Sequence, residues 1–335
     1  MSIGRSLPAC IGIDAGYGWT KWSANNKSDR FPSIWAPYQS GSEGWGISHA
    51  VPIIVNDMAP AVTGHQCVGS TQIRHPFQDS RLTNPDILPI LATAIWEAGV
   101  EGDIILGTGT PLETFSSEVD NSTQALTNLI LQIRCGHETR SVRIVKACLR
   151  PQGVAAAIWL LWERRIAQQR AADLYLVIDI GNRTTDVLTL RMDNGQPIPN
   201  LSFSSSIAIA TAATRFQKTL SQKTGTPIPL DEAQKALEEP VFWNGHNIGG
   251  PDAASPFLDN LAEALKDEIR QHLGSFLPRV SGFVTVGGGA ALLGRRLDNV
   301  SNGTRTHLSV EESIFANTYG YQRTAEREAT RNGTR

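Results

Sequence analysis

The sequence has few cysteines, no long apolar run and almost no net charge. Its four cysteines, Cys10, Cys67, Cys135 and Cys148, form no C-x-x-C pair. This wide spacing argues against a zinc site or a disulfide framework and favours reduced, mostly buried thiols. The longest uninterrupted apolar run covers residues 154–162, far below the ~18 residues of a membrane span. With no signal-peptide core at the start of the chain, the sequence predicts a cytoplasmic protein without a membrane partner.

The charges nearly cancel, because 30 lysines and arginines stand against 32 aspartates and glutamates, for a net charge of −2. Such a chain has no overall attraction for the phosphates of DNA, so we do not expect direct DNA binding. Hydrophobic residues make up 41% and charged residues 19% of the 335 positions, which is enough to build a folded core. At roughly 100–200 residues per domain, this length indicates two domains or one large one.

Apolar runs typical of strands alternate with segments of helical periodicity. The strand-like runs are residues 11–14, 20–23, 104–106, 142–149, 174–180 and 283–286. The helical segments are residues 121–134, 153–170, 208–224, 231–239 and 257–276. Turn-forming residues predict loops at residues 35–46 and 243–255, and residues 324–335 are predicted as a loose polar tail. This order predicts an α/β fold in which helices cover sheets.

Two segments about half the chain apart resemble each other. Residues 11–21 read IGIDAGYGWTK, and residues 176–186 read LVIDIGNRTTD. Each segment is an apolar strand, an aspartate, one further residue, a glycine, a short polar turn, a threonine and a return strand. A repeat of this length predicts two similar domains rather than a solenoid, whose repeats are far shorter.

A turn that begins Asp-x-Gly suits a phosphate ligand. Its glycine lets the backbone turn tightly and brings N–H groups close to an anion. The threonine hydroxyls can donate to phosphate oxygens, and Lys21 adds a positive charge after the first turn. The two aspartates, Asp14 and Asp179, can hold Mg²⁺ through its waters, because this ion keeps water and takes few protein ligands. An ordinary hairpin explains either turn alone, so the matched pair is what favours a metal–nucleotide site.

A third glycine turn follows the strand-like run at residues 283–286. Gly287, Gly288 and Gly289 come next and lead into a short apolar segment that includes Leu292. Bare glycines let a flat base or a ribose lie against the backbone. A tight strand-to-helix connection explains the same residues, so the interpretation depends on the order of all three turns.

This order resembles a known superfamily. Asp14-x-Gly16, Asp179-x-Gly181 and the glycines at 287–289 are similar to the phosphate-1, phosphate-2 and adenosine motifs of the actin, sugar kinase and heat-shock chaperone ATPases. The resemblance implies an actin-like α/β fold: two RNase H-like domains with mixed five-stranded sheets, flanked by helices, around a nucleotide cleft. It also implies domain boundaries, with domain I at residues 1–152, domain II at residues 153–320 and a C-terminal tail at residues 321–335.

Within the superfamily, the chain resembles the bacterial actin-like proteins of the ParM type, which segregate plasmids. The spacing of Lys21 after Asp14 and the segments at residues 106–112 and 150–156 carry this narrower resemblance. It implies a filament that assembles with nucleotide bound and disassembles after slow hydrolysis. It also implies a DNA-binding adaptor of the ParR type, which would link the filament to a plasmid centromere.

The resemblance further implies the residues of the site. Gln152 stands where ParM relatives have a glutamate; it would orient the attacking water, with Asp14 and Asp179 assisting as the ligands of hydrated Mg²⁺. Alternatively, Gln152 only caps the connecting helix. The residues implied to contact ATP or GTP are Gly16, Tyr17, Gly18, Trp19, Thr20, Lys21, Gly181, Asn182, Arg183, Thr184, Thr185, Lys235, Gly287, Gly288, Gly289 and Leu292. For the adenine pocket, Arg215 and Lys218 are rivals of Lys235, and a solvated helix surface explains any one of them.

Other functions fit the same fold. A small-molecule kinase needs a carboxylate base, for which Glu101, Asp103 and Glu113 are the nearest candidates. A cell-shape actin homologue and a chaperone ATPase share the motifs, although no substrate-binding domain follows the ATPase motifs in this sequence.

The tryptophans give a further indication of partners. Trp35, Trp45 and Trp243 lie in loop-like segments, where large aromatic residues can mark subunit contacts. Trp159 and Trp162 are three positions apart, so a shared, packed helix face is predicted for them.

Overall fold

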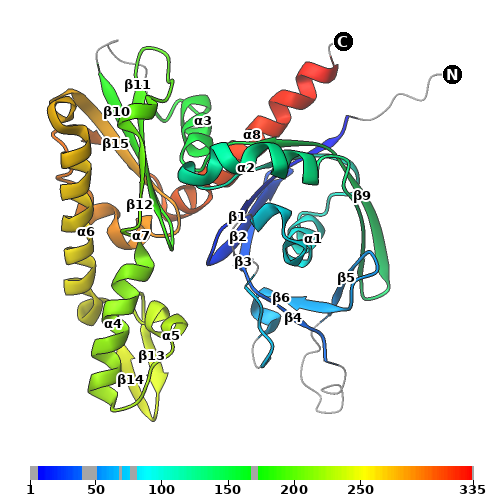
Figure 1. Ribbon diagram of the computed structural model, residues 1–335, viewed down its shortest axis with the longest axis horizontal. Helices are drawn as coiled ribbons and strands as arrows, with labels where there is room; N and C mark the ends of the chain where they lie inside the picture. The colour runs from blue at the N-terminus through cyan, green and yellow to red at the C-terminus, as the bar shows by residue number, and fades with distance from the viewer. Residues whose placement is uncertain (1–6, 40–50, 68–69, 76–80, 167–172, 334–335) are drawn as a thin grey trace. The chain divides into compact units, whose positions relative to one another are not determined.

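The computed structural model describes residues 7–39, 51–67, 70–75, 81–166 and 173–333. The chain divides into two compact units: unit 1 comprises residues 1–159 and 317–335, and unit 2 comprises residues 160–316. The chain passes from unit 1 into unit 2 within helix α3 (Val154–Trp162) and returns within helix α8 (Val310–Gly333). Both units contain a sheet and helices (Figure 1).

Unit 1 contains one curved sheet. Its strands are β1 (Ala9–Ala15), β2 (Trp19–Ala24), β3 (Lys27–Pro32), β4 (Trp35–Pro37), β5 (Ile53–Val55), β6 (Ala61–Thr63), β7 (Gly102–Thr108), β8 (Ile130–Cys135) and β9 (Glu138–Leu149). They pair in the order β3-β2-β1-β7-β9-β8-β5-β6-β4, so the sheet has nine strands where five were predicted. The prediction is wrong here because β9 is 12 residues long and also pairs with β8, which extends the sheet beyond the expected edge.

Helices cover both faces of this sheet. Helix α1 (Leu88–Glu97) lies within the curve of the sheet and contacts β1, β2, β5, β6 and β8 (Figure 1). Helix α8 packs on the other face, where a Cβ at Gly107 would lie 2.0 Å from the carbonyl oxygen of Tyr321. Side chains alternate between the two faces of a strand, so β1 gives Ile11 and Ile13 to the core around α1 and turns Gly12 toward α8. Helix α2 (Leu112–Leu126) also belongs to unit 1.

Unit 2 repeats the central part of this sheet. Its main strands are β10 (Leu174–Ile180), β11 (Thr185–Arg191), β12 (Phe203–Ser205), β15 (Val280–Val286) and β16 (Thr304–Arg305). Their order, β12-β11-β10-β15-β16, matches β3-β2-β1-β7-β9 of unit 1. In both sets the first three strands are antiparallel and the last three are parallel. The sequence repeat therefore reflects a repeat of topology, and this five-stranded sheet agrees with the prediction.

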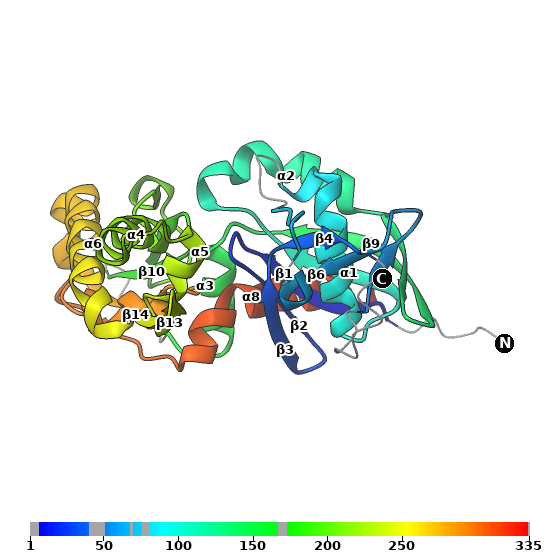
Figure 2. The ribbon, with the colours of Figure 1, turned by 90° about the horizontal axis from the view of Figure 1, so that it is seen from below.

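A helical layer packs against the sheet of unit 2. Its helices are α4 (Ile209–Thr224), α5 (Leu230–Lys235), α6 (Pro251–Leu273) and α7 (Ala290–Leu293). Helix α6 buries Leu258, Leu261, Leu265 and Ile269, whose spacing of three and four residues places them on one face. A separate hairpin of β13 (Pro240–Trp243) and β14 (His246–Gly249) directly precedes α6 (Figures 1 and 2).

The predicted α/β class and all six predicted strand positions are confirmed. The runs at residues 11–14, 20–23, 104–106, 142–149, 174–180 and 283–286 lie in β1, β2, β7, β9, β10 and β15. The helices predicted at residues 208–224, 231–239 and 257–276 overlap α4, α5 and α6, although α5 already ends at Lys235 and α6 runs from Pro251 to Leu273. The helix predicted at residues 153–170 ends at Trp162, and residues 167–170 lie outside the described residues.

The helix predicted at residues 121–134 is wrong in its second half. Helix α2 ends at Leu126, and β8 begins at Ile130. Leu131 and Ile133 are buried while Ile130, Gln132 and Arg134 are exposed, which is the two-residue period of a strand.

The two predicted loops are also wrong where the chain is described. Trp35 is buried in β4, and Trp243 belongs to β13. Asn244 and Gly245 adopt positive φ angles, so the polar residues mark a tight hairpin turn and not a long loop. Trp45 lies outside the described residues.

Two expectations about helices are corrected. The loose tail predicted at residues 324–335 is part of α8 up to Gly333, because Tyr321, Ala325 and Ala329 recur every four residues and are buried. Trp159 and Trp162 do not share a packed face: Trp159 packs on Tyr319, whereas Trp162 is 62% exposed. Among the helices of the described residues, none is long and apolar enough to cross a membrane.

Candidate functional site

The two Asp-x-Gly hairpins have the same backbone register. In the hairpin of β1 and β2, Asp14 lies opposite Lys21. In the hairpin of β10 and β11, Asp179 lies opposite Asp186. The pairing leaves turns of the same length, residues 16–19 and residues 181–184. Each unit therefore presents a buried aspartate at the end of a central strand, directly before a glycine turn.

Both turns require their glycine. A Cβ at Gly16 would lie 2.8 Å from the carbonyl oxygen of Trp19, and a Cβ at Gly181 would lie 2.8 Å from that of Thr184. In the second turn, the Gly181 N–H donates to this Thr184 oxygen over 2.9 Å. Because a side chain would collide with the turn, the repeat of glycine in the sequence has a direct steric cause.

Lys21 forms a buried ion pair with Asp14. The Lys21 Nζ lies 2.8 Å from Asp14 Oδ2, and the two residues are 8% and 2% exposed. Their positions opposite each other on antiparallel strands bring the two side chains together on one face of the sheet. An ammonium in this position is compensated by Asp14 and lies beside the turn that would receive an anion.

Gln152 completes this cluster in unit 1. Its side-chain Nε2 donates to Asp14 Oδ1 over 3.1 Å, and its backbone N–H donates to the carbonyl oxygen of Thr110 over 3.0 Å. The donor end of the amide is thereby anchored, and Oε1 is the end that can accept a hydrogen bond from water. The structure thus brings Gln152 to the Asp14–Lys21 hairpin from a distant part of the sequence.

In unit 2, the second and third glycine turns meet. Gly287 has a φ of +87°, and a Cβ there would lie 2.3 Å from Asp179 Oδ1. The Gly289 N–H donates to the carbonyl oxygen of Ile180 over 2.8 Å. Gly288 is exposed and has no atom within 4 Å of an added Cβ. The third turn therefore packs on Asp179 through its first glycine and leaves the backbone of its second glycine open to a ligand.

The turn after Asp179 also contacts the start of helix α4. The Ala210 N–H donates to the carbonyl oxygen of Asn182 over 2.9 Å. The Asn182 side-chain oxygen is buried and has no hydrogen-bond partner among the described residues. A buried polar atom without a partner costs free energy, so this oxygen marks a place where a bound group can supply a donor.

Two family models match the chain, one in each half. The family model described as actin like proteins N terminal domain matches residues 12–154. The model described as archaeal actin homologue MreB-like, C-terminal, matches residues 177–299. A curated relative from Thermoplasma volcanium, an archaeal actin homolog, is 38% identical over 326 residues, which cover 95% of this chain and 98% of the relative.

The chain belongs to the family of archaeal actin homologues. A crystal structure of an archaeal actin homolog in complex with ADP is 35% identical, with a TM-score of 0.84 over 95% of this chain and 99% of that one. A 15-stranded ParM filament from Clostridium botulinum is 18% identical, with a TM-score of 0.81 over 96% of this chain and all of that one. The predicted superfamily and the actin-like fold are therefore confirmed. The narrower resemblance to the ParM type is supported by a shared fold alone.

Several predicted ligand-contacting residues already have protein partners in this archaeal actin homologue. The Thr20 hydroxyl shares a hydrogen bond of 2.8 Å with Ser33, and the Thr185 hydroxyl donates to the carbonyl oxygen of Ile207. The Trp19 ring contacts two side chains: the Arg30 guanidinium is 4.5 Å from its ring centroid, and the centroid of the His65 ring is 5.7 Å away. These contacts hold the turns in shape, and contact of these residues with a nucleotide stays a prediction.

Other predicted residues lie at the surface of the turns or of the helices. Tyr17, Gly18 and Thr184 are half-buried, and Arg183 is exposed. Lys235 is exposed and forms an ion pair with Glu232 one helical turn away, and Arg215 and Lys218 are exposed on α4. Leu292 is partly buried against the core of unit 2. The adenine pocket therefore stays a prediction.

Two of the carboxylates considered as a kinase base, Asp103 and Glu113, have structural roles. Asp103 forms a two-point ion pair with Arg143, with the Arg143 Nε donating to Oδ1 over 2.8 Å. Glu113 lies in the first turn of α2, where an acidic side chain favours the helix dipole. Neither carboxylate joins the cluster of Asp14, Lys21 and Gln152 in the contacts of the described residues.

Sequence reasoning missed Asn317 and Ser33. The Asn317 Oδ1 accepts hydrogen bonds from the N–H groups of Gly153 (2.9 Å) and Ala156 (3.2 Å), so it caps the start of α3 next to Gln152. The Ser33 hydroxyl donates to the carbonyl oxygen of Gly16 over 2.6 Å, and the Ser33 N–H donates to that of Gly18 over 3.0 Å. Asn317 is more than 160 positions from the residues that it caps, so no local pattern could have found it.

Proposed function

We propose that this archaeal actin homologue binds ATP or GTP with Mg²⁺, hydrolyses it slowly, and assembles with copies of itself into filaments in the cytoplasm. The observation that carries the proposal is the duplicated hairpin, with one buried aspartate and one glycine turn in the same register in each unit. A relative 35% identical over nearly its whole length has been crystallised with ADP, which supports nucleotide binding by this chain.

The residues of each unit would have distinct roles. The N–H groups of the turns at residues 16–19 and 181–184 and the ammonium of Lys21 would hold phosphate oxygens. Gln152, anchored through its donor end on Asp14, would accept a hydrogen bond from the attacking water and orient it. The open backbone at Gly288 would lie against the ribose or the base.

The acidic residues fit a hydrated magnesium ion. Asp14 and Asp179 are buried carboxylates that precede the two turns, and the buried Asn182 oxygen lacks a donor among the described residues. Carboxylates and water-mediated contacts are what Mg²⁺ favours. When bound, Mg²⁺ supplies positive charge that offsets the charge of the phosphates.

Self-assembly is supported by membership in the family and by the fold shared with a ParM filament. A narrower version of the proposal adds plasmid segregation through a DNA-binding adaptor of the ParR type. That version is supported by the fold alone, and it predicts co-sedimentation of such an adaptor with the filaments.

The test is right-angle light scattering of the purified chain after addition of Mg-ATP or Mg-GTP, with Mg-ADP as the control, followed by sedimentation and a phosphate-release assay. We expect a triphosphate-dependent rise, pelletable protein and a later decay as phosphate is released. If the chain binds nucleotide but shows no rise at tens of micromolar, the filament proposal is wrong. A small-molecule kinase would then be the next hypothesis, tested with a panel of hydroxyl acceptors.

A further inference from the structure

Unit 2 presents an exposed aromatic side chain on the β13–β14 hairpin. Val241 and Ile248 face each other across the hairpin and are buried. Successive side chains of a strand point to opposite faces, so Phe242 points outward and is 73% exposed. Among the described residues, no large hydrophobic side chain is more exposed. Trp243 packs inward, with its Nε1 donating to the hydroxyl of Thr226 over 3.1 Å, and this contact holds the hairpin in place.

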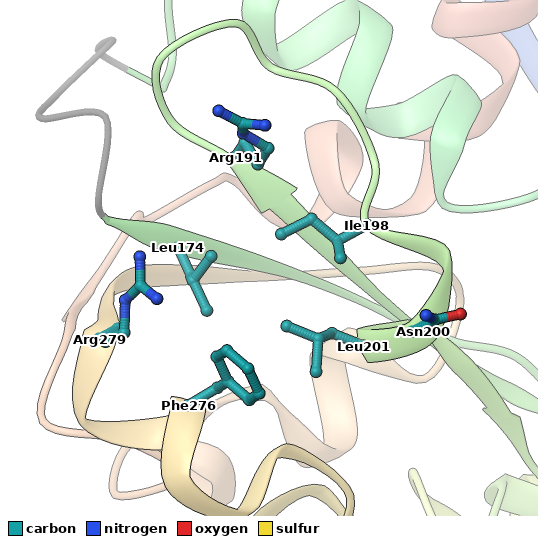
Figure 3. A pocket seen from close by; sticks show the side chains of 7 residues that line it. All are labelled: Leu174, Arg191, Ile198, Asn200, Leu201, Phe276 and Arg279. Atoms are coloured by element: carbon teal, nitrogen blue, oxygen red, sulfur yellow. The ribbon is translucent and has the colours of Figure 1, made fainter.

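The same unit has an apolar pocket of about 500 Å³ (Figure 3). Its apolar lining comes from the first residue of β10, the segment after β11 and the 3-10 turn at Gly274–Arg279: Leu174, Ile198, Leu201 and Phe276. Arg191, Arg279 and Asn200 complete the lining, and Figure 3 shows the apolar side chains directed into the hollow. Because Leu174 begins β10 and Asp179 lies near its other end, the pocket is distinct from the candidate nucleotide site.

Helix α6 separates the pocket from the exposed phenylalanine. The hairpin ends at Gly249, directly before α6, and the pocket residues Phe276 and Arg279 come directly after it. The helix has 23 residues and at 1.5 Å per residue spans roughly 35 Å. Figure 1 shows the hairpin and the far end of α6 at opposite ends of the unit. The projecting ring and the hollow therefore lie at opposite ends of unit 2.

Glutamates lie beside the hairpin, and arginines line the pocket. Glu238 and Glu239 are exposed immediately before β13. Arg191 and Arg279 flank the pocket; Arg191 forms an ion pair with Asp193, and the Arg279 guanidinium lies 6.0 Å from the ring centroid of Phe276. Opposite charges around an apolar centre favour one orientation of approach.

We infer that Phe242 of one copy inserts into the Leu174–Phe276 pocket of the next copy, with Glu238 and Glu239 facing Arg191 and Arg279. The inference rests on the proposed self-assembly and names the contact that carries it. A projection and a pocket on different ends of one chain make a head-to-tail contact, which repeats into an open polymer. A buried aromatic residue in a pocket is the usual centre of such a contact, and the surrounding surface supplies the remaining area.

The test uses three matched substitutions of exposed apolar residues by aspartate. Phe242→Asp removes the projecting ring, Phe276→Asp places a charge in the pocket, and Val310→Asp, at a 61% exposed position of the same unit, is the control. We expect the critical concentration for polymerisation with Mg-ATP to rise at least tenfold in the first two variants and to stay unchanged in the control. Circular dichroism and nucleotide binding check that each variant is folded.

Mixing the first two variants makes the test specific. The Phe242→Asp chain keeps its pocket and the Phe276→Asp chain keeps its ring, so a mixture can form one intact contact and no more. Analytical ultracentrifugation with Mg-ATP should show dimers in the mixture and monomers of each variant alone. If the wild type and both variants polymerise alike, the contact is wrong and the proposed function stands. If the wild type itself stays monomeric, both the proposed contact and the proposed self-assembly are wrong.

Discussion

The ammonium of Lys21 lies 2.8 Å from a carboxylate oxygen of Asp14, and both side chains are buried where β1 and β2 face each other. In a buried pair each charge depends on the other, because removal of one partner leaves an uncompensated charge away from water. The same lysine would hold a phosphate oxygen in the proposed function. Lys21 is therefore expected to contribute both to folding and to phosphate binding, and the two contributions can be measured separately.

Lys21→Met should lower the free energy of unfolding by about 3–5 kcal/mol, because Asp14 is left buried without its cation. The double variant Lys21→Met, Asp14→Asn should regain most of this stability, since neither charge remains. Urea denaturation measures the stability, and calorimetric titration with Mg-ATP measures the affinity. Both variants should bind ATP more weakly, and unchanged affinity in the double variant would contradict the phosphate-1 assignment.

Asp179→Asn should reduce nucleotide hydrolysis by about 10–100-fold, the usual effect of losing a group that holds a metal through water. Nucleotide binding should change far less, because the backbone of both turns is retained. A phosphate-release assay and a fluorescent nucleotide titration measure the two effects. Asp193→Asn, a substitution of a surface carboxylate in the same unit, is the control; full turnover by the Asp179 variant would remove this residue from the mechanism.

Gln152→Ala should slow hydrolysis by roughly 100-fold, the scale expected when one positioned hydrogen-bonding group is lost from a reacting centre. Filaments should then persist longer after Mg-ATP is added, which light scattering follows directly. Asn317→Ala removes the cap of α3 beside Gln152 and should cost about 1 kcal/mol of stability with a smaller loss of hydrolysis. If Gln152→Ala hydrolyses ATP at the wild-type rate, Gln152 serves only in the helix connection.

Gly287→Ala and Gly288→Ala separate folding from ligand contact in the third turn. Gly287 has a φ of +87°, and a Cβ there would meet Asp179 Oδ1 at 2.3 Å, so its replacement should cost about 1–3 kcal/mol or more. Gly288 has open space at this position, and its replacement should change stability by less than about 0.5 kcal/mol. Thermal unfolding and nucleotide titration check both. A Gly288→Ala chain with wild-type nucleotide affinity would show that the base and ribose do not contact this backbone.

The buried phenol of Tyr175 should make the free energy of unfolding depend on pH. Burial raises the pKa of its phenol from 10.0 to about 12, although a hydrogen bond with Thr306 lowers it in part. The folded state thus favours the neutral phenol, so its contribution is complete below pH 10 and is lost as the pH rises toward 12. A shift of two units corresponds to about 3 kcal/mol. Urea denaturation of wild type and Tyr175→Phe at pH 9 to 12 should show the steeper decline in the wild type; parallel declines would contradict this.

The sequence predicts the local features of the candidate site but not the contacts between its distant parts. Asp14, Asp179 and the two turn glycines follow from the repeat, because a strand, an aspartate and a required glycine are local features. The packing of Gly287 on Asp179 and the anchoring of Gln152 on Asp14 depend on how distant strands pair. The sequence repeat also indicates two similar folds, but it does not show the extension of the first sheet through β8, β5, β6 and β4, because the residues of β8 lie within the helix predicted at residues 121–134.

The sequence by itself determined the α/β class, the six strands at the centre of the two sheets and the duplicated phosphate-type turn, because apolar periodicity and glycine requirements act within a few residues. The tertiary structure alone decided the partners of these turns. It placed Ser33 under the first turn, Asn317 at the start of α3, and the exposed Phe242 and its candidate pocket at opposite ends of α6. Such contacts join residues far apart in the chain, and they exist only once the sheets have formed and the helices have packed against them.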